Sequence, residues 1–167
     1  MNPKAASCTP TSPEAVPLLR MTVLDFQATP SCTFFEGRTK ALIAQYDAFS
    51  PLPGYHVNGA LTLGENVADN SGLAVAVKAY RHSLRGDAAP LIDGYTGEQR
   101  LFLAFAQIWH EKLRDAARIE RIKVDPHSPG QFRANGALRN QAAFDEAFAV
   151  KPGDAMYLPP DERISLW

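Results

Sequence analysis

The sequence predicts a mainly α-helical single domain, and three features support this prediction. A chain of 167 residues of which 46% are hydrophobic is long and apolar enough to build one core. Apolar residues recur at helical spacing from Phe34 onward, beginning with Phe35, Leu42 and Tyr46. Stretches rich in Pro and Gly then separate the periodic segments at intervals typical of helices.

The first 32 residues differ from the rest of the chain. They are rich in Pro, Ser, Thr and Ala and show no sustained periodicity. We therefore expect a poorly ordered leader at residues 1–32, followed by a helical domain at residues 33–167. Cys8 and Cys32 both lie in the leader, and their number and spacing match neither a disulfide scaffold nor a metal motif.

Three longer helices are predicted in order along the domain. The first covers residues 34–48 and ends at the stretch Ser50-Pro-Leu-Pro-Gly. The second covers residues 63–84 and precedes a loop at residues 86–97. The third runs over residues 97–118, and its first half is apolar almost all round, so that half should lie centrally in the core.

Two shorter helices are predicted after the third. Ser128 is a favourable N-cap, Pro129 suits the first helical position, and Gln131 completes a capping box, so a helix should begin here. Asn140 is the expected cap of a further helix at residues 141–149. The remaining C-terminal residues are predicted to be extended.

Two carboxylates at the start of the second helix suggest part of a metal site. Glu65 and Asp69 stand four residues apart, so both project from one face of a helix. One could bind a metal while the other orients a second ligand. A hydrolytic zinc needs about three protein ligands, usually including histidines, and the His-Glu-x-x-His motif that often supplies them does not occur in this sequence.

The stretch His110-Glu-Lys-Leu-Arg114 is not a substitute for that motif. Arg114 stands where the second histidine must be, and a guanidinium cannot bind a cation. A zinc site built from Glu65, His127 and His56 would use suitable residue types, but nothing in their spacing brings them together.

Charge and hydropathy exclude several classes of partner. A formal net charge of −1 gives no electrostatic reason to expect nucleic acid or acidic membranes as partners. No apolar run is long enough to span a bilayer, and the N-terminus is a poor signal peptide. As written, the sequence is expected to be cytoplasmic.

Several motifs together carry a specific resemblance. They are Tyr55-His-Val-Asn-Gly-Ala-Leu-Thr-Leu-Gly-Glu-Asn-Val-Ala-Asp-Asn-Ser-Gly-Leu, then His127-Ser-Pro-Gly-Gln-Phe-Arg, and the final Trp167. In this order and spacing they resemble the neprilysin-type zinc metallopeptidases, which include enzymes of the neprilysin and endothelin-converting-enzyme kind. The resemblance runs from about Pro30 to the end and covers only the C-terminal part of the family's catalytic domain.

The resemblance implies a role for each of four residues. Glu65 resembles the third zinc ligand, and Asp69 the carboxylate that orients a zinc-binding histidine. His127 resembles the residue that stabilises the oxyanion of the tetrahedral intermediate, and Arg133 the residue that holds the backbone carbonyl of a peptide substrate. These roles suit the chemistry of carboxylate, imidazole and guanidinium groups.

The family's two zinc histidines and general-base glutamate lie upstream of the matching region, and this sequence has no counterpart for them. We therefore expect a chain that is truncated relative to the family, binds no zinc by itself and is inactive alone. Without zinc, Arg133 is free to pair with Asp69 or Glu65.

Two alternatives stay open. A separate chain could supply the zinc helix and complete a peptidase, or the chain could be a non-catalytic module that binds peptides or forms homo-oligomers through an uncovered apolar surface. The sequence does not identify the substrate or the oligomeric state, nor whether the truncation is natural.

Overall fold

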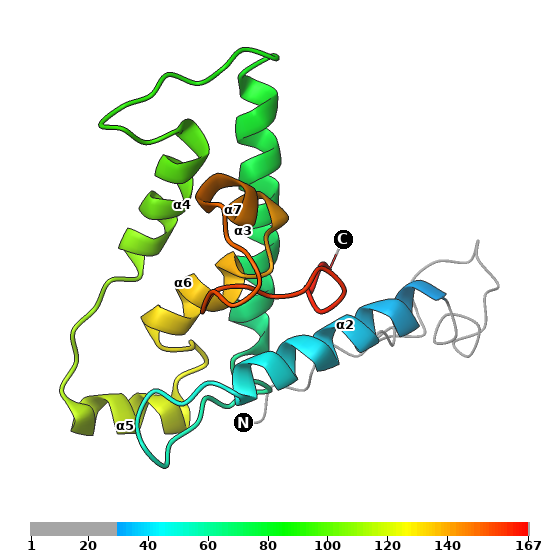
Figure 1. Cartoon of the computed structure of the whole chain (residues 1–167). Coiled ribbons are helices and arrows are strands. Elements are labelled where there is room, and N and C mark those ends of the chain that lie inside the picture. Colours follow the sequence, from blue (N-terminus) through cyan, green and yellow to red (C-terminus); the bar gives the residue numbers. More distant parts are fainter. Residues whose placement is uncertain (1–29, 167) are drawn as a thin grey trace, which may run out of the picture.

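The structure, a computed structural model, describes residues 30–166, and this part of the chain contains helices and no strand (Figure 1). The mainly α prediction is confirmed. In chain order the helices are α2 (Pro30–Asp47), α3 (Leu63–Ser83), α4 (Gly97–Ile108), α5 (Asp115–Val124), α6 (Gly130–Leu138) and α7 (Ala142–Phe148).

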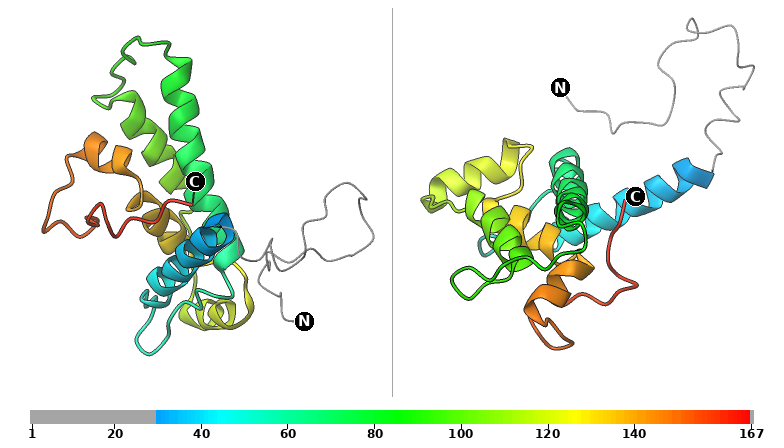
Figure 2. Two further views of the ribbon diagram at one scale, coloured as in Figure 1. Left: turned by 90° about the vertical axis from the view of Figure 1, so that its right-hand side faces the viewer. Right: turned by 90° about the horizontal axis from the view of Figure 1, so that it is seen from above.

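The helices are arranged around α3, which is the longest (Figure 1). α2 and α6 both pack against α3 and also contact each other, while α4 packs against α6 and α7. Seen from above, α2 extends away from the remaining helices to one side of α3, α4 lies on the other side, and α7 lies in front of α3 (Figure 2). α6 is thus the element shared by both halves of the fold.

The core consists of two apolar clusters that meet at α6. One joins Phe132 of α6 to Leu42 and Tyr46 of α2. The other joins Ala137 and Leu138 of α6 to the C-terminal half of α3, and to α4 and α7. Aromatic rings strengthen both clusters, because such contacts add about 0.5–1.5 kcal/mol beyond the area they bury.

The buried stripe of α3 changes character along the helix. Asn66, Asp69 and Asn70 are buried in its N-terminal half, whereas Leu73 and Val77 are buried further on. Buried polar groups need partners. The polar half of the stripe therefore marks where α3 contributes hydrogen-bonding groups and ion pairs rather than apolar packing.

The C-terminal segment after α7 has no helix in its described part and is held by side-chain amides. Asn70 Nδ2 donates to the carbonyl of Ile164 at 2.8 Å, and the N–H of Ile164 donates to Asn140 Oδ1 at 3.1 Å. Trp167 lies outside the described residues.

The first two predicted helices are confirmed with small shifts. The helix predicted at residues 63–84 is α3, with Leu84 as its C-cap. The helix predicted at residues 34–48 is α2, which already begins at Pro30. Residues 30–32 of the expected leader are therefore helical, and the rest of that segment lies outside the described residues, so the domain boundary stays a prediction.

The prediction of one helix over residues 97–118 is wrong. α4 ends at Ile108, where Trp109 N–H bonds to the carbonyl of Ala106 and begins a tighter last turn, and α5 starts only at Asp115. Contacts with α6 account for the break, because the intervening loop packs against the start of that helix. Phe102 is buried as expected, but Leu103 and Ile108 are exposed.

Both predicted caps of the short helices are also wrong. The cap position of α6 is Pro129 and that of α7 is Gln141, and neither makes a side-chain capping bond. Ser128 and Asn140 instead use their side chains in buried contacts with other elements. Tertiary partners have displaced the local capping arrangement that the sequence favours.

No helix in the described part of the chain combines the length and the apolar character needed to cross a membrane.

Candidate functional site

The candidate site is centred on an ion-pair cluster between α3 and α6. Arg133 of α6 faces Asp69 of α3 with two hydrogen bonds, from Nε to Oδ2 at 2.6 Å and from Nη2 to Oδ1 at 2.8 Å. The same Nη2 donates to Glu65 Oε2 at 3.2 Å. The pairing of Arg133 with both carboxylates agrees with the expectation from the sequence.

The two carboxylates lie in different environments. The side chain of Asp69 is 8% exposed and that of Arg133 is 10% exposed, whereas Glu65 is 41% exposed. Burial opposes the charge of Arg133, but the hydrogen bonds and charges of Asp69 and Glu65 outweigh it and raise the pKa of the guanidinium above its ordinary value. Arg133 therefore stays protonated in a largely dry setting.

The indole ring of Trp109 forms one side of this cluster. Cζ of Arg133 lies 3.8 Å from the centroid of the Trp109 ring, a cation–π contact. Nη1 of Arg133 has no hydrogen-bond partner among residues 30–166. The guanidinium is thus fixed on one edge by Asp69 and on its face by Trp109, while Nη1 is available to a ligand.

His127 lies between two carboxylates. Its Nδ1 is 2.7 Å from Asp125 Oδ1, and its Nε2 is 3.4 Å from Glu65 Oε2. Asp125 is partly desolvated, yet the backbone N–H and the ring of His127 hydrogen-bond to it and lower its pKa below the ordinary value. Asp125 thereby orients the imidazole so that Nε2 points toward Glu65.

A buried polar chain connects the His127 loop to α3. Ser128 Oγ donates to Asn66 Oδ1 at 2.9 Å, and Asn66 Nδ2 donates to Thr62 Oγ1 at 2.9 Å. All three residues are buried. These bonds hold the loop that carries His127 against the first turn of α3, which carries Glu65.

Glu111 takes the place of the expected cap at the start of α6. Its Oε1 accepts from the backbone N–H of Gly130 at 3.1 Å, and its Oε2 accepts from Arg121 Nη1 at 2.9 Å. A carboxylate at a helix N-terminus is favoured by the dipole and by the free N–H groups. Gly130 is needed here because a Cβ would collide with the carbonyl oxygen of Trp109.

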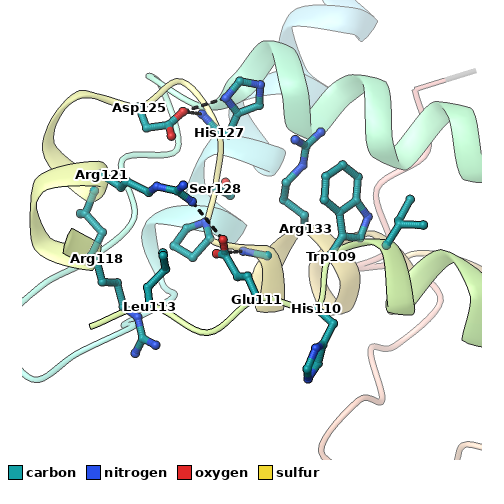
Figure 3. Close-up of a pocket in the computed structure, with 14 residues that line it drawn as sticks. Trp109, His110, Glu111, Leu113, Arg118, Arg121, Asp125, His127, Ser128 and Arg133 are labelled. Atoms are coloured by element: carbon teal, nitrogen blue, oxygen red, sulfur yellow. Dashed lines mark hydrogen bonds and ion pairs between the residues drawn. The ribbon is translucent and has the colours of Figure 1, made fainter. Parts of the chain in front are cut away.

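A pocket opens beside the cluster, with a volume of about 250 Å³. Arg133 and Trp109 line one end of it, and Arg118 of α5 lies at the other, beyond the Glu111–Arg121 pair (Figure 3). His127 also lines the pocket (Figure 3). The cluster is therefore accessible to a ligand from the pocket.

The structure brings together all four residues that the sequence singled out. Glu65, Asp69, His127 and Arg133 come from two helices and a loop and are joined by ion pairs and hydrogen bonds of 2.6–3.4 Å. Their individual roles stay predictions.

Sequence reasoning missed the contributions of Trp109, Glu111 and Asp125. Asp125 had a local signal, because an Asp two residues before a His can bond to it. For Trp109 and Glu111 no local signal exists, because their partners are 24 and 19 residues away.

The described residues do not form a complete metal site by themselves. No group of three His, Cys, Asp or Glu side chains in residues 30–166 is arranged to hold a metal ion. His56, which the sequence offered as a third ligand, joins no such group. Glu65 is of the right type for zinc but is a single ligand, and its Oε2 faces Arg133 and His127.

Comparison with known proteins gives a consistent result. The model of peptidase family M13 matches residues 23–164. Human neprilysin is 36% identical over 150 residues, which cover 87% of this chain and 20% of neprilysin. Human endothelin-converting enzyme 1 is 38% identical over 137 residues, covering 80% and 17% of the two chains.

Solved structures agree with these matches. The crystal structure of zinc metalloprotease Zmp1 of Mycobacterium tuberculosis in complex with an inhibitor superposes with a TM-score of 0.81 at 50% identity, covering 84% of this chain and 22% of that one. The chain thus spans about a fifth of the length of the relatives that it matches.

Proposed function

The chain belongs to peptidase family M13, and we propose that its residues 30–166 provide the C-terminal part of a zinc-peptidase active site. The observation that carries this proposal is the convergence of Glu65, Asp69, His127 and Arg133 beside one pocket. In this proposal Glu65 is a zinc ligand and Asp69 is the carboxylate that orients a zinc-binding histidine, as the resemblance implies for both.

His127 and Arg133 are proposed to contact the peptide. Asp125 holds the His127 ring, which leaves Nε2 directed into the site, where a donated proton would stabilise negative charge on an attacked carbonyl. Arg133 is anchored by Asp69 and Trp109, and its Nη1 is available to a backbone carbonyl. A fixed guanidinium positions a peptide with little further loss of side-chain freedom.

Zinc, the metal of the family, would polarise the scissile carbonyl and activate water. The residues of this chain do not fit that role alone, because they offer one ligand where about three are needed. We therefore propose that the chain alone does not hydrolyse peptides. Activity would require a segment carrying the His-Glu-x-x-His motif, which does not occur in these 167 residues.

Metal analysis together with a hydrolysis assay tests this proposal. Purified full-length chain is dialysed against zinc, its bound metal is measured, and cleavage of an internally quenched peptide is followed. We expect neither stoichiometric zinc nor cleavage. Stoichiometric zinc that is lost in Glu65→Ala, accompanied by cleavage, would show that the chain is an autonomous peptidase. The control is Glu36→Ala, which removes an exposed carboxylate from α2.

A non-catalytic peptide-binding module is the second candidate, and the free Nη1 of Arg133 in the pocket wall favours it. A module of this kind would bind short peptides without zinc, and binding would weaken in Arg133→Lys, which keeps the charge but loses the forked donors. Peptide affinity that is unchanged in Arg133→Lys would exclude this function.

A further inference from the structure

Among residues 30–166, the Arg, Asp and Glu side chains that line the pocket have ion-paired or hydrogen-bonded partners, with one exception. Arg121 is bound to Glu111 at 2.9 Å, and Asp125 to His127 at 2.7 Å. Arg133 is compensated by carboxylates of α3 that stand outside the pocket lining. Each of these side chains therefore already has an ion-paired or hydrogen-bonded partner among residues 30–166.

Arg118 is the exception. It lines the pocket from α5 and is half-buried, and its guanidinium has no hydrogen bond or ion pair among residues 30–166. Arg121, one turn further along α5, is already occupied by Glu111. A permanent cation with five free donors in a pocket wall is a suitable partner for a carboxylate.

The rest of the wall suits part of a peptide. Trp109, Leu113 and Ile122 supply apolar surface to the pocket lining. Arg133 offers Nη1 at the same end as Trp109, opposite Arg118 (Figure 3). A volume of about 250 Å³ is slightly below the ~300 Å³ at which pockets for drug-sized ligands begin. The pocket is thus sized for one or two residues of a peptide rather than for a large cofactor.

From this arrangement we propose that the pocket is a subsite for a carboxylate-bearing peptide residue, with Arg118 as the residue that selects it. This proposal deepens the proposed function and rests on it, because it takes Arg133 as the group that holds the adjacent peptide carbonyl. The carboxylate can come from an acidic side chain or from a free peptide C-terminus. Both sources present the same two oxygens to the guanidinium.

Calorimetric titration of the full-length chain with three peptides tests the proposal. N-acetyl-Phe-Glu amide carries a side-chain carboxylate, N-acetyl-Phe-Gln free acid carries a terminal one, and N-acetyl-Phe-Gln amide carries none. We expect one or both acidic peptides to bind about fivefold or more tightly than the neutral amide, as is typical of a partly desolvated charge pair. Which acidic peptide gains identifies the source of the carboxylate.

Two variants locate the effect. Arg118→Gln should abolish the preference for a carboxylate while leaving the affinity for the neutral amide unchanged. Arg114→Gln is the matched control, because Arg114 lies four residues earlier, is exposed and does not line the pocket. The preference should persist in Arg114→Gln.

Several outcomes would overturn the inference. Equal affinity for all three peptides, or an equal loss of the preference in Arg114→Gln, would exclude Arg118 as a selective residue. If the peptides bind equally and Arg133→Lys weakens all of them, the subsite is wrong while the peptide-holding role of Arg133 stands. If the preference survives but Arg133→Lys has no effect, that role of Arg133 is wrong instead. Absence of any binding would overturn both.

Discussion

Replacing Asp69 with Asn should destabilise the fold far more than replacing Glu65 with Gln. Both changes neutralise one carboxylate that pairs with Arg133. Asp69 is 8% exposed and makes two charge-assisted hydrogen bonds to Arg133 at 2.6 and 2.8 Å. Glu65 is 41% exposed and makes one such bond at 3.2 Å. Each variant replaces a carboxylate by the corresponding amide, so the difference between their costs in unfolding free energy reports mainly the different burial of the two carboxylates.

The expected magnitudes follow from burial. Breaking a buried ion pair by removing one partner costs about 3–5 kcal/mol, because a charge is left uncompensated. Glu65 remains near Arg133 in Asp69→Asn and lessens this cost, so we expect about 2–4 kcal/mol. Glu65→Gln should cost less than about 1 kcal/mol, since solvent screens an exposed pair.

Urea unfolding measures the stability of both variants. A double-mutant cycle is then formed by the wild type, Asp69→Asn, Arg133→Met and the double variant Asp69→Asn/Arg133→Met. The double variant leaves no buried unpaired charge, so its cost should be smaller than the sum of the single costs. The coupling free energy should exceed about 1.5 kcal/mol. Coupling below about 0.5 kcal/mol, or equal costs for Asp69→Asn and Glu65→Gln, would refute the view that Asp69–Arg133 is a desolvated pair.

Two further predictions concern the surroundings of the site. Gly130→Ala should cost about 1–3 kcal/mol of unfolding free energy, because its Cβ meets the carbonyl oxygen of Trp109. Gly72→Ala, in an exposed part of α3 where a Cβ meets nothing within 4 Å, should instead stabilise by about 0.5–1 kcal/mol, and equal effects in thermal unfolding would contradict the steric argument. Because the folded-state pKa of Asp125 is lowered, the stability it contributes is present above the unfolded pKa of about 3.9 and is lost as pH falls through the lower folded value. The difference in urea stability between the wild type and Asp125→Asn should therefore shrink below about pH 4, and a difference that grows there would show that the sign is wrong.

The sequence predicted the elements whose signals are local. Helical spacing of apolar residues located α2 and α3, and the Gly- and Pro-rich stretches around residue 52 and residue 90 marked the loops between them and α4. The i, i+4 spacing of Glu65 and Asp69 was enough to place both on one face of α3. These features depend on neighbours within one or two helical turns, so they are visible in the chain itself.

The errors lie where distant residues compete with local preferences. Glu111 caps α6 from 19 residues away and takes over the role expected of Ser128. Ser128 instead donates a buried hydrogen bond to Asn66, 62 residues earlier. The loop between α4 and α5, which carries Glu111, interrupts the helix predicted over residues 97–118. Each of these outcomes satisfies a buried polar group or a helix end that the local sequence would have satisfied differently.

By itself, the sequence determined the helical class, the family and the residue types of the site. Only the tertiary structure decided how those residues are used, because the free energy of a charged side chain depends on its burial and on which opposite charge lies within a few ångströms. Packing of α6 against α3 places Arg133 on Asp69 and Glu65, and packing of the loop after α4 places Trp109 over the guanidinium. The same packing leaves Arg118 in the pocket wall without an ion-pair partner among residues 30–166, which distinguishes it from Arg121 and Arg133 in a way that their positions in the sequence do not predict.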